Sequence, residues 1–522
     1  MSSDVKEYVV SLNANIDYAQ FWTEMETTTA NIATIPDRSV DIANERAGSL
    51  RSCHYALTDE EADRLRKDPR VYCVEIPPMQ RNDIELKLSL YQDSNFTKTT
   101  SDSGNFVNWG IRRCIADINI YGTSSSVSGP YNYCLDGTGV DVVISDSGLQ
   151  IDHPEFTDSY GNSRVQLIDW YTESGLPGTQ SQNFYRDYDG HGTHVGGIAT
   201  GKTYGWAKNA QIYSMKVNGL EGSGDSGTGI SIPDCFDAIK LWHQNKPINP
   251  QTGYKRPTVV NMSWGFITTF SNIIGGVYRG TPWTDTIKQS AYGMIGNASN
   301  RFKIRVGSVD IDIDEMLAAG IIITISAGNY FQKIDVPLGS DYDNYYTSSL
   351  TGNRYYNRGG SPHGSGDALI VGSIDSTVFD TTTEYKSTFS ESGPGVDIYA
   401  PGSNIMSCTS TQNGWGSGSQ PYYLNSSYKQ TNISGTSMAA PQVAGMAALF
   451  LQLNPYATPA QVKAWLQNQS TSVIYSTGLD NDYTDSRSIK GSTNRFLYNT
   501  FNSATSLSAG GSVELRNISY RV

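Results

Sequence analysis

The chain has 522 residues and a formal net charge of −13, with 38% hydrophobic and 17% charged residues. This length allows roughly two to four domains, and the composition is ordinary for a soluble globular enzyme. The acidic balance argues against a nucleic-acid-binding protein, which needs a basic face. No apolar run is long enough to cross a bilayer, and the N-terminal residues lack a basic segment followed by an apolar core, so we expect neither a membrane span nor a secretory signal.

The six cysteines are too few and too scattered to form a disulfide framework, and none has the paired spacing of a zinc site. Cys114 and Cys134 flank a Gly/Ser-rich loop. They are compatible either with a disulfide or with two free thiols.

The first 76 residues have the pattern of a small α+β unit. Strand patterns cover 7–12, 52–57 and 71–76, and helix patterns cover 17–26 and 58–65. Thr58 precedes three acidic residues, which is typical of an N-cap followed by an acidic first turn. Residues 77–107 follow as a polar linker rich in Ser, Thr, Asp and Asn, although 84–90 alternates like a strand.

Strand and helix patterns alternate over residues 108–470. Short apolar, β-branched runs lie at 140–145, 211–217, 258–263, 320–327 and 368–374, and helix patterns lie at 191–200, 233–244, 312–319, 437–453 and 458–467. This alternation predicts an α/β domain with a mostly parallel sheet covered on both faces. Two segments rich in Gly, Tyr, Asn and Ser, 267–311 and 335–365, are predicted surface insertions, and 471–522 is a polar C-terminal extension that ends in a strand-like 512–522.

The segment 432–453 places a Gly-Thr-Ser turn before a helix of small and apolar residues. Such a helix has almost no polar face, so we expect it to be buried. Ser437 would then stand at the N-terminus of a buried helix, where free N–H groups and the positive end of the dipole favour an oxyanion. A serine cap in front of a core helix explains this segment equally well.

A serine hydroxyl becomes a good nucleophile only when a base takes its proton, and that base needs an acidic partner that fixes its tautomer. His191 has glycines on both sides and a helix pattern after it. His194 follows three residues later, which also suits a pair of metal ligands, but no Glu stands where a metalloprotease needs it, so we disfavour a metal site.

Two polar residues follow strands of the predicted sheet. Asp146 ends the strand at 140–145, and Asn329 follows the strand at 320–327 after Gly328. The carboxyl ends of parallel strands are where α/β sheets build sites, although an Asp or Asn beside Gly is also common in turns. An Asn side chain can donate to an oxyanion, and Asp, His and Ser occur here in the chain order known for subtilisin.

Four motifs in this order resemble the subtilisin-like serine proteases. They are Asp146-Ser147-Gly148 with His153-Pro154-Glu155, His191-Gly192-Thr193-His194-Val195, Ala327-Gly328-Asn329, and Gly435-Thr436-Ser437-Met438-Ala439-Ala440-Pro441. Residues 203–208 run into 211–213 without a long calcium-loop insertion, which is similar to the proteinase K branch. The resemblance implies a three-layer subtilisin-like α/β fold over about residues 108–470.

The resemblance also implies a role for each matching residue. Ser437 would be the nucleophile, His191 the general base and acid, Asp146 the residue that orients His191, and Asn329 the oxyanion donor. Substrate would bind as an extended strand, by main-chain hydrogen bonds. The substrate-binding residues would be Ser263, Trp264, Gly265, Ala327 and Gly328, with Gly222, Ser223 and Gly224 on the other side of the peptide. Ala327 and Gly328 would line the pocket for the residue before the cut.

The chemistry implied by the resemblance needs no cofactor, but a structural calcium is a hypothesis. Asp397 matches an aspartate that helps to bind calcium in the proteinase K branch, and the carbonyls of Gly366 and Ala368 would be its partners. Hard oxygen ligands of this kind suit calcium.

Trp264 and Phe266 are bulkier than the residues usual in the family, so the substrate preference of relatives cannot be transferred.

The first unit resembles the family's N-terminal pro-region, a ferredoxin-like chaperone and inhibitor, through residues 55–62 and 68–75. This implies a serine endopeptidase made as a self-inhibited zymogen and cut within residues 77–107. The alternative is an idle or permanently inhibited protease-fold protein that acts in binding or assembly. An esterase with the same residues is disfavoured because no Gly-x-Ser-x-Gly motif occurs. A pro-region without a secretion signal points to another export route or to a phage or virus.

Overall fold

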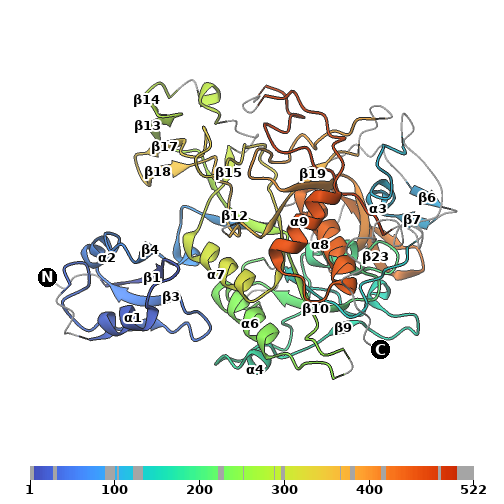
Figure 1. Cartoon of the computed structure of the whole chain (residues 1–522), viewed down its shortest axis with the longest axis horizontal. Coiled ribbons are helices and arrows are strands. Elements are labelled where there is room, and N and C mark those ends of the chain that lie inside the picture. Colours follow the sequence, from blue (N-terminus) through green and yellow to red (C-terminus); the bar gives the residue numbers. More distant parts are fainter. Residues whose placement is uncertain are drawn as a thin grey trace.

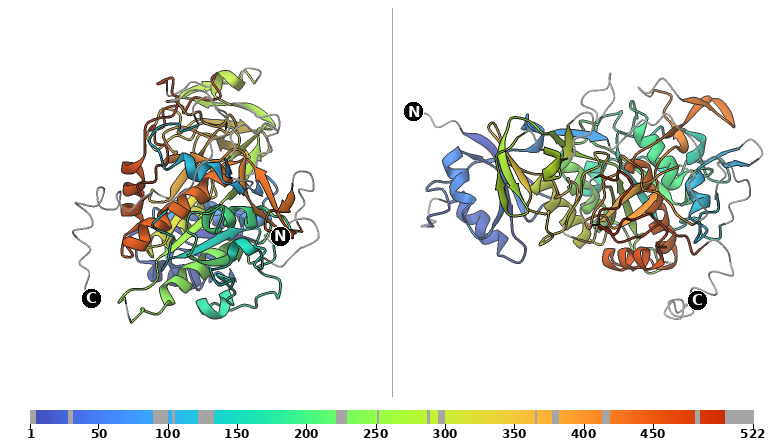
Figure 2. Two further views of the ribbon diagram at one scale, coloured as in Figure 1. Left: turned by 90° about the vertical axis from the view of Figure 1, so that its right-hand side faces the viewer. Right: turned by 90° about the horizontal axis from the view of Figure 1, so that it is seen from above.

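The computed structural model describes residues 5–27, 32–88, 100–102, 105–121, 133–220, 229–250, 252–286, 289–294, 300–364, 366–376, 382–412, 419–479 and 484–501. Three parts are evident in Figure 1: a small N-terminal domain at one end, a large α/β domain, and a lobe of short strands above them. Figure 2 shows the N-terminal domain and the strands β6 (Thr100–Asp102) and β7 (Asn105–Val107) at opposite ends of the molecule.

The first domain is a four-stranded antiparallel sheet with two helices. The sheet order is β2-β3-β1-β4. Its elements are β1 (Lys6–Leu12), α1 (Tyr18–Glu26), β2 (Ile42–Asn44), β3 (Ser52–Leu57), α2 (Asp59–Leu65) and β4 (Val71–Glu75). Asp17 caps α1, and Thr58 with Glu61 forms a capping box at α2. Phe21, Tyr55 and their neighbours give this domain a hydrophobic core of its own.

A seven-stranded parallel sheet forms the centre of the large domain, in the order β20-β19-β16-β11-β8-β10-β9. The strands are β8 (Asp141–Asp146), β9 (Val165–Gln166), β10 (Gln211–Lys216), β11 (Thr258–Met262), β16 (Ile322–Ser326), β19 (Leu369–Ile374) and β20 (Ile398–Pro401). Their apolar side chains are almost all buried, as expected for a sheet covered on both faces. The predicted α/β class with a mostly parallel sheet is therefore confirmed.

The helices of this domain are α3 (Trp109–Arg113), α4 (Trp170–Ser174), α5 (His191–Thr200), α6 (Ile232–Asn245), α7 (Gly307–Ala318), α8 (Thr436–Leu453) and α9 (Pro459–Gln469). α8 is buried from Thr436 to Leu451 and packs on the middle strands of the sheet and on α5. α6 packs against α7, which in turn contacts β1 and β4 of the first domain. Among the described residues no helix is both long and apolar enough to span a membrane.

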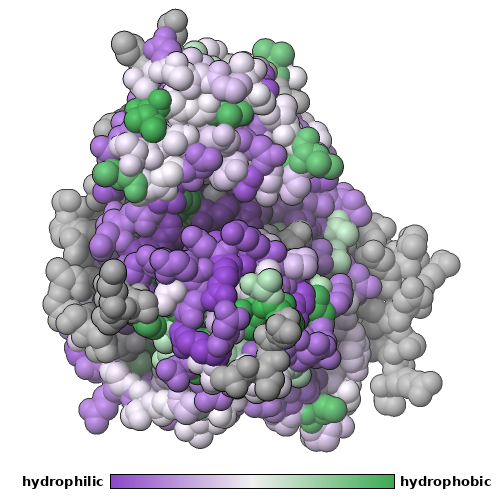
Figure 3. All heavy atoms as spheres, turned by 90° about the vertical axis from the view of Figure 1, so that its left-hand side faces the viewer, coloured by the Kyte–Doolittle hydropathy of each residue, from purple (hydrophilic) through white to green (hydrophobic). Residues whose placement is uncertain are grey.

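The two predicted insertions come together in one lobe. β13 (Ile273–Tyr278) and β14 (Thr281–Trp283) from the first insertion join β17 (Tyr345–Ser348) and β18 (Gly352–Tyr355) from the second in one antiparallel sheet. Phe270, Trp283, Phe302, Tyr346 and Tyr356 form a small core beneath it. Figure 3 shows this side of the molecule hollowed between the lobe and the first domain, with a mostly hydrophilic surface around the hollow. A cavity of about 330 Å³ is lined by residues 82–85 together with residues of the lobe.

The remaining elements are short strands and 3₁₀ turns. They are the 3₁₀ turns Pro78–Gln80, Pro154–Phe156 and Gln289–Tyr292, and the strands β5 (Glu85–Leu88), β12 (Trp264–Thr269), β15 (Arg301–Lys303), β21 (Ile405–Thr409), β22 (Gln420–Tyr422) and β23 (Asn425–Ile433). β12 lies between β15 and β5 in a three-stranded sheet. β23 pairs with both β21 and β22.

Two boundaries differ from the sequence predictions. α7 begins at Gly307 and not at 312, so the first insertion ends earlier than predicted. The core of the large domain continues beyond 470, because Ile474, Phe496 and Leu497 pack into it and Phe496 bridges to Tyr399. Cys114 and Cys134 are not joined by a disulfide. The strand-like segment 512–522 lies outside the described residues.

Candidate active site

The predicted catalytic residues lie at the ends of central strands or the starts of central helices. Asp146 is the last residue of β8, and Ser263 follows its neighbour β11 directly. Asn329 comes three residues after the end of β16, which pairs with β11. Because these strands are parallel, the residues that follow them meet at one edge of the sheet. His191 begins α5, Ser437 is the second residue of α8, and the two helices pack together.

Asp146 and His191 form a buried hydrogen-bonded pair. Nδ1 of His191 lies 2.7 Å from Oδ1 of Asp146, and both side chains are fully buried. A carboxylate accepts hydrogen bonds, so Nδ1 carries the ring proton and Nε2 is the basic nitrogen of the neutral ring. Burial disfavours the charged imidazolium, but the Asp146 carboxylate outweighs it, and the pKa of His191 is raised above its usual value.

A second buried carboxylate, Asp187, joins the end of β8 to the start of α5. It accepts hydrogen bonds from Ser147 Oγ at 2.9 Å and from Gly190 N at 2.7 Å. It also accepts from the amide and hydroxyl of Thr193 at 2.9 and 2.5 Å. Asp187 therefore fixes the loop that carries His191. The sequence analysis missed this residue, because the capping signal is sought at the N-cap, which is Gly190 here, and Asp187 lies three positions before it.

The glycine after His191 is required by close packing. A Cβ atom at Gly192 would lie 2.1 Å from the carbonyl oxygen of Gly148, well inside van der Waals contact. Gly148 itself has a φ of +120°, which side chains rarely allow. These two glycines let the His191 helix approach the loop that follows Asp146.

Ser437 is buried in the first turn of α8. Its Oγ donates a hydrogen bond to the carbonyl of Ser263 at 2.9 Å, and Ser263 Oγ donates to the carbonyl of Ser437 at 3.0 Å. The candidate nucleophile is thus tied to the residue that immediately precedes β12. Ser263 and Trp264 therefore connect the nucleophile to the predicted substrate-binding strand.

The amide of Asn329 has an orientation set by α8. Its Oδ1 accepts hydrogen bonds from the backbone N–H and the hydroxyl of Thr436, both at 3.0 Å. Its Nδ2 is buried and has no hydrogen-bond partner among the described residues. A buried donor without an acceptor costs about 1–3 kcal/mol. Asn329 contacts Thr436, the residue before Ser437. Its Nδ2 donor is therefore suited to bind an anionic oxygen.

β12 carries a strand of the first part of the chain along its edge. Antiparallel pairing joins Trp264 to Leu88, Gly265 to Lys87, Phe266 to Leu86 and Ile267 to Glu85. Residues of the predicted linker therefore lie, in an extended conformation, along the predicted substrate-binding strand. The Trp264 indole donates to the carbonyl of Ser145 at 2.9 Å, so its bulk is directed into the core.

The predicted residues Gly222, Ser223 and Gly224 lie outside the described part of the chain. Ala327 and Gly328 follow β16 and are both buried. The amide of Gly328 donates to the hydroxyl of Thr436 at 3.1 Å, which holds this segment beside the start of α8.

The first domain contacts α6 and α7 through buried charges. Arg46 is 5% exposed, and its guanidinium donates to Asp237 of α6 and to Asp312 of α7, each at 2.9 Å. Removing one partner from a buried ion pair is costly, because the other charge remains unpaired. Arg46 therefore ties the first domain to both helices.

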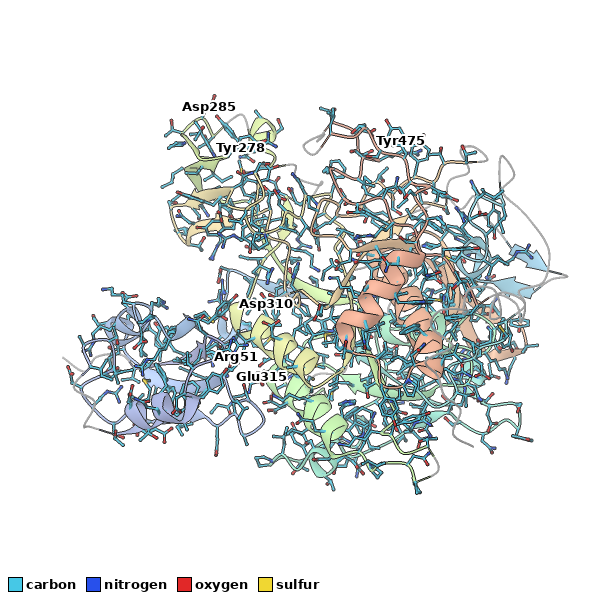
Figure 4. The ribbon with its side chains drawn as sticks, viewed as in Figure 1. Arg51, Tyr278, Asp285, Asp310, Glu315 and Tyr475 are labelled. Carbon is cyan, nitrogen blue, oxygen red and sulfur yellow. The ribbon has the colours of Figure 1, made fainter. Side chains whose placement is uncertain are left out.

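A second group of contacts lies along α7 (Figure 4). The backbone N–H of Arg51 donates to Glu315 at 3.1 Å, and the two residues lie at the boundary between the domains. Oε1 of Glu75 accepts from the amide of Ser308 at 2.6 Å. A carboxylate in the first turn of α7 also interacts favourably with the helix dipole.

His194 has the environment of a structural residue and not of a metal ligand. Its Nε2 lies 3.0 Å from the carbonyls of Ile405 and Thr431. Burial lowers its pKa to about 3, so the ring is neutral. Among the described residues no group of three or more His, Cys, Asp or Glu side chains is arranged to hold a metal.

The groups predicted to bind calcium do lie together, but around a lysine. Lys463 Nζ of α9 is 2.7 Å from Asp397 Oδ1 and 2.9 Å from the carbonyl of Ala368, and it also donates to the carbonyl of Gly366. Asp397 Oδ2 accepts from the amide of Ile370 at 2.9 Å. An ammonium group therefore fills the centre of the oxygen cluster, so the residues present do not fit a calcium ion.

A family profile described as the subtilase family matches residues 137–496. An extracellular serine proteinase of Thermus sp. (strain Rt41A) is 28% identical over 423 residues, 81% of this chain and 72% of that protein. Alkaline serine exoprotease A of Vibrio alginolyticus is 28% identical over 455 residues, 87% of this chain and 60% of that protein. Proteinase R of Parengyodontium album is 28% identical over 348 residues, 66% of this chain and 60% of that protein.

The fold is shared with a solved structure. Fervidolysin from Fervidobacterium pennivorans, described as a keratinolytic enzyme related to subtilisin, matches with a TM-score of 0.52 at 17% identity. The match covers 94% of this chain and 60% of fervidolysin. The predicted subtilisin-like fold is thereby confirmed.

Proposed function

This chain belongs to the subtilase family of serine endopeptidases, and we propose that it hydrolyses peptide bonds through Asp146, His191 and Ser437. The observation that carries this assignment is the buried 2.7 Å contact between Asp146 and His191 Nδ1, which leaves Nε2 as the base. Ser437 Oγ turns from the Ser263 carbonyl and attacks the scissile carbonyl carbon while its proton passes to Nε2.

The tetrahedral intermediate places a negative charge on the former carbonyl oxygen. The Asn329 Nδ2 donor and the Ser437 N–H hold this oxyanion, and Thr436 supports Asn329 by fixing its Oδ1. His191 then gives its proton to the leaving amine, and an acyl-enzyme remains on Ser437. Water attacks the ester with His191 again as the base, which releases the acid and restores the serine. The reaction uses no cofactor.

The first domain is the natural candidate for a pro-region that inhibits the enzyme. β5 pairs with β12 as an extended substrate would, and Arg46, Glu75 and Arg51 hold the first domain on α6 and α7. Leu88 pairs with Trp264, the residue next to Ser263. We therefore expect self-cleavage just beyond Leu88, at the bond after Ser89. The cleaved domain then remains bound as an inhibitor until it is degraded.

The intact mass of the purified full chain over time, beside Ser437→Ala, tests this function. We expect the wild type to lose its first 89 residues and to react with a serine-directed fluorophosphonate, while Ser437→Ala stays whole and unlabelled. Ser214→Ala is the matched control, because it removes another buried serine hydroxyl, on β10. Absence of labelling in wild-type protein freed of its first domain by a second protease would overturn the proposal and favour a protease-fold binding protein.

A further inference from the structure

A lysine side chain lies between the predicted substrate-binding strand and the segment predicted to line the pocket for the residue before the cut. Lys303, at the end of β15, passes between Gly265 of β12 and Gly328 beyond β16. A Cβ atom at Gly265 would lie 2.8 Å from Lys303 Cε, and one at Gly328 would lie 2.5 Å from Lys303 Cδ. The aliphatic stem of one side chain therefore touches both backbone segments and fills the gap between them.

Lys303 is held firmly in this position. It is 3% exposed, and its Nζ donates to the carbonyl of Ser326, the last residue of β16, at 2.9 Å. Burial also lowers the pKa of its ammonium group. A substrate side chain that entered this gap would have to displace a buried lysine from its hydrogen bond.

Glu391 closes the same space from the other side. Its amide donates to the carbonyl of Gly328 at 2.9 Å, and a Cβ atom at Gly328 would lie 2.6 Å from its Oε1. The side chain is almost completely buried, and Oε1 has no hydrogen-bond partner among the described residues. Burial raises the pKa of this carboxyl group, and nearby Lys303 opposes that shift. An amine and a carboxyl group thus share the pocket, so neither an acidic nor a basic substrate side chain is favoured.

We propose that Lys303 and Glu391 restrict the pocket for the residue before the cut to small uncharged side chains, such as Gly, Ala and Ser. This inference rests on the proposed function and names its substrate class. Lys303 comes from the first insertion, so its effect is specific to chains that carry this segment. The sequence after β5 agrees with it, because the residue that follows Leu88 is Ser89.

Ten-residue peptides with the sequence of residues 84–93 test the proposal, with Ser, Ala, Leu, Phe, Lys or Glu at position 89. The enzyme is the full chain after self-cleavage, and mass spectrometry of the products locates the cut. We expect kcat/KM for cleavage after Ser or Ala to exceed that after Phe, Lys or Glu by about 100-fold, the scale on which one pocket discriminates. A wild-type preference for Leu, Phe or a charged residue overturns the proposal.

Three variants separate space from charge. Lys303→Gly should open the pocket and raise kcat/KM for the Leu and Phe peptides at least about 10-fold. Lys303→Met keeps the volume without the charge and should keep the preference for small residues. Lys246→Met is the control, because Lys246 is another largely buried lysine, which pairs with Asp141 at the opposite end of β8 from Asp146. It should leave the preference unchanged.

The outcomes distinguish this inference from the proposed function. If wild-type protein is labelled by the fluorophosphonate but cuts after large residues, or if a folded Lys303→Gly enzyme gains nothing on Leu and Phe, only the pocket assignment is wrong. If the wild type is neither labelled nor active on any peptide, the proposed function fails and the pocket assignment with it. Melting temperatures show which variants are folded, and the wild-type peptide series tests the proposal without any variant.

Discussion

The catalytic centre and the Asp397 cluster are two places where the sequence predicted that distant groups would meet. In both places they do meet. At the catalytic centre, Asp146 and His191 contact each other directly, and both belong to the motifs that predicted the site. At Asp397 the predicted carboxylate and backbone oxygens also lie together. Here, however, Lys463, from a helix outside any motif, supplies the cation. A motif thus predicts which groups come together at a site, whereas a side chain from outside the motif can determine what those groups bind.

The strongest test of the catalytic half of this comparison is Ser437→Ala. We expect kcat on peptides to fall on the order of 10⁶-fold, the loss measured for the nucleophile of subtilisin itself. The fold should be retained, because the substitution removes only a hydroxyl that bonds to the Ser263 carbonyl. Because Ser437→Ala should not process itself, rates would be measured on wild type and variant both freed of the first domain by a second protease, with Ser214→Ala alongside. A loss of less than tenfold would show that Ser437 is not the nucleophile.

Asp146→Asn tests the contact between Asp146 and His191. An amide at this position can donate to Nδ1 and hold the wrong tautomer, so we expect kcat to fall about 10⁴-fold. The base works only when neutral, and Asp146 raises the pKa of His191. Wild-type kcat/KM should therefore be lost as the pH falls through that raised pKa. In the variant, burial still lowers the pKa of the ring and only the weaker influences of Asp189 and Asp187 raise it, so the acidic limb should move to lower pH. An unmoved limb would contradict this role for Asp146.

Asn329→Ala removes the buried Nδ2 donor. We expect kcat to fall about 10²–10³-fold while KM changes little, because the donor acts on charge that develops in the transition state. Steady-state kinetics on one peptide substrate measures both constants. Thr436→Val is the companion variant, since it keeps the amide that donates to Asn329 and removes the hydroxyl, which donates to Asn329 and accepts from Gly328. It should cost less than Asn329→Ala. A rise in KM at constant kcat would instead make Asn329 a ground-state binding residue.

Local sequence signals predicted the elements that form the centre of the molecule. The buried strands are continuous apolar runs, and His191–Thr200 and Thr436–Leu453 are helices at almost the predicted bounds. The start of α7 was missed because Gly307 and Ser308 have low helix propensity, and the contact of Ser308 with Glu75 that supports this turn comes from another domain.

Several unpredicted features depend on contacts between residues far apart in the chain. β13 pairs with β17 across about seventy positions, so two insertions that looked independent form one sheet. Phe496 reaches the core by bridging to Tyr399, which no local pattern in a polar tail indicates. Lys303 and Lys463 act through backbone carbonyls. Any residue provides such an acceptor, so the sequence alone does not reveal these sites.

Variants of Lys463 test the Asp397 cluster, where we expect the smallest effect. If its ammonium is the cation of the Asp397 cluster, EDTA should leave the melting temperature of the wild type unchanged. Lys463→Ala leaves the Asp397 carboxylate without its partner in a largely buried site. We expect a cost of about 1–3 kcal/mol and a fall in melting temperature of a few degrees. Scanning calorimetry in EDTA measures both.

The same variant should acquire a response to calcium. Without Lys463, the carboxylate of Asp397 and the carbonyls of Gly366 and Ala368 leave a group of hard oxygens of the kind that calcium binds. Calcium should therefore restore part of the lost stability in Lys463→Ala but none in the double variant Lys463→Ala/Asp397→Asn. A wild type whose melting temperature falls in EDTA would show instead that the cluster takes the ion despite the lysine. The oxygen ligands and the calcium ion that they bind would then both follow from the motif. The Asp397 cluster would no longer differ from the catalytic centre in this respect.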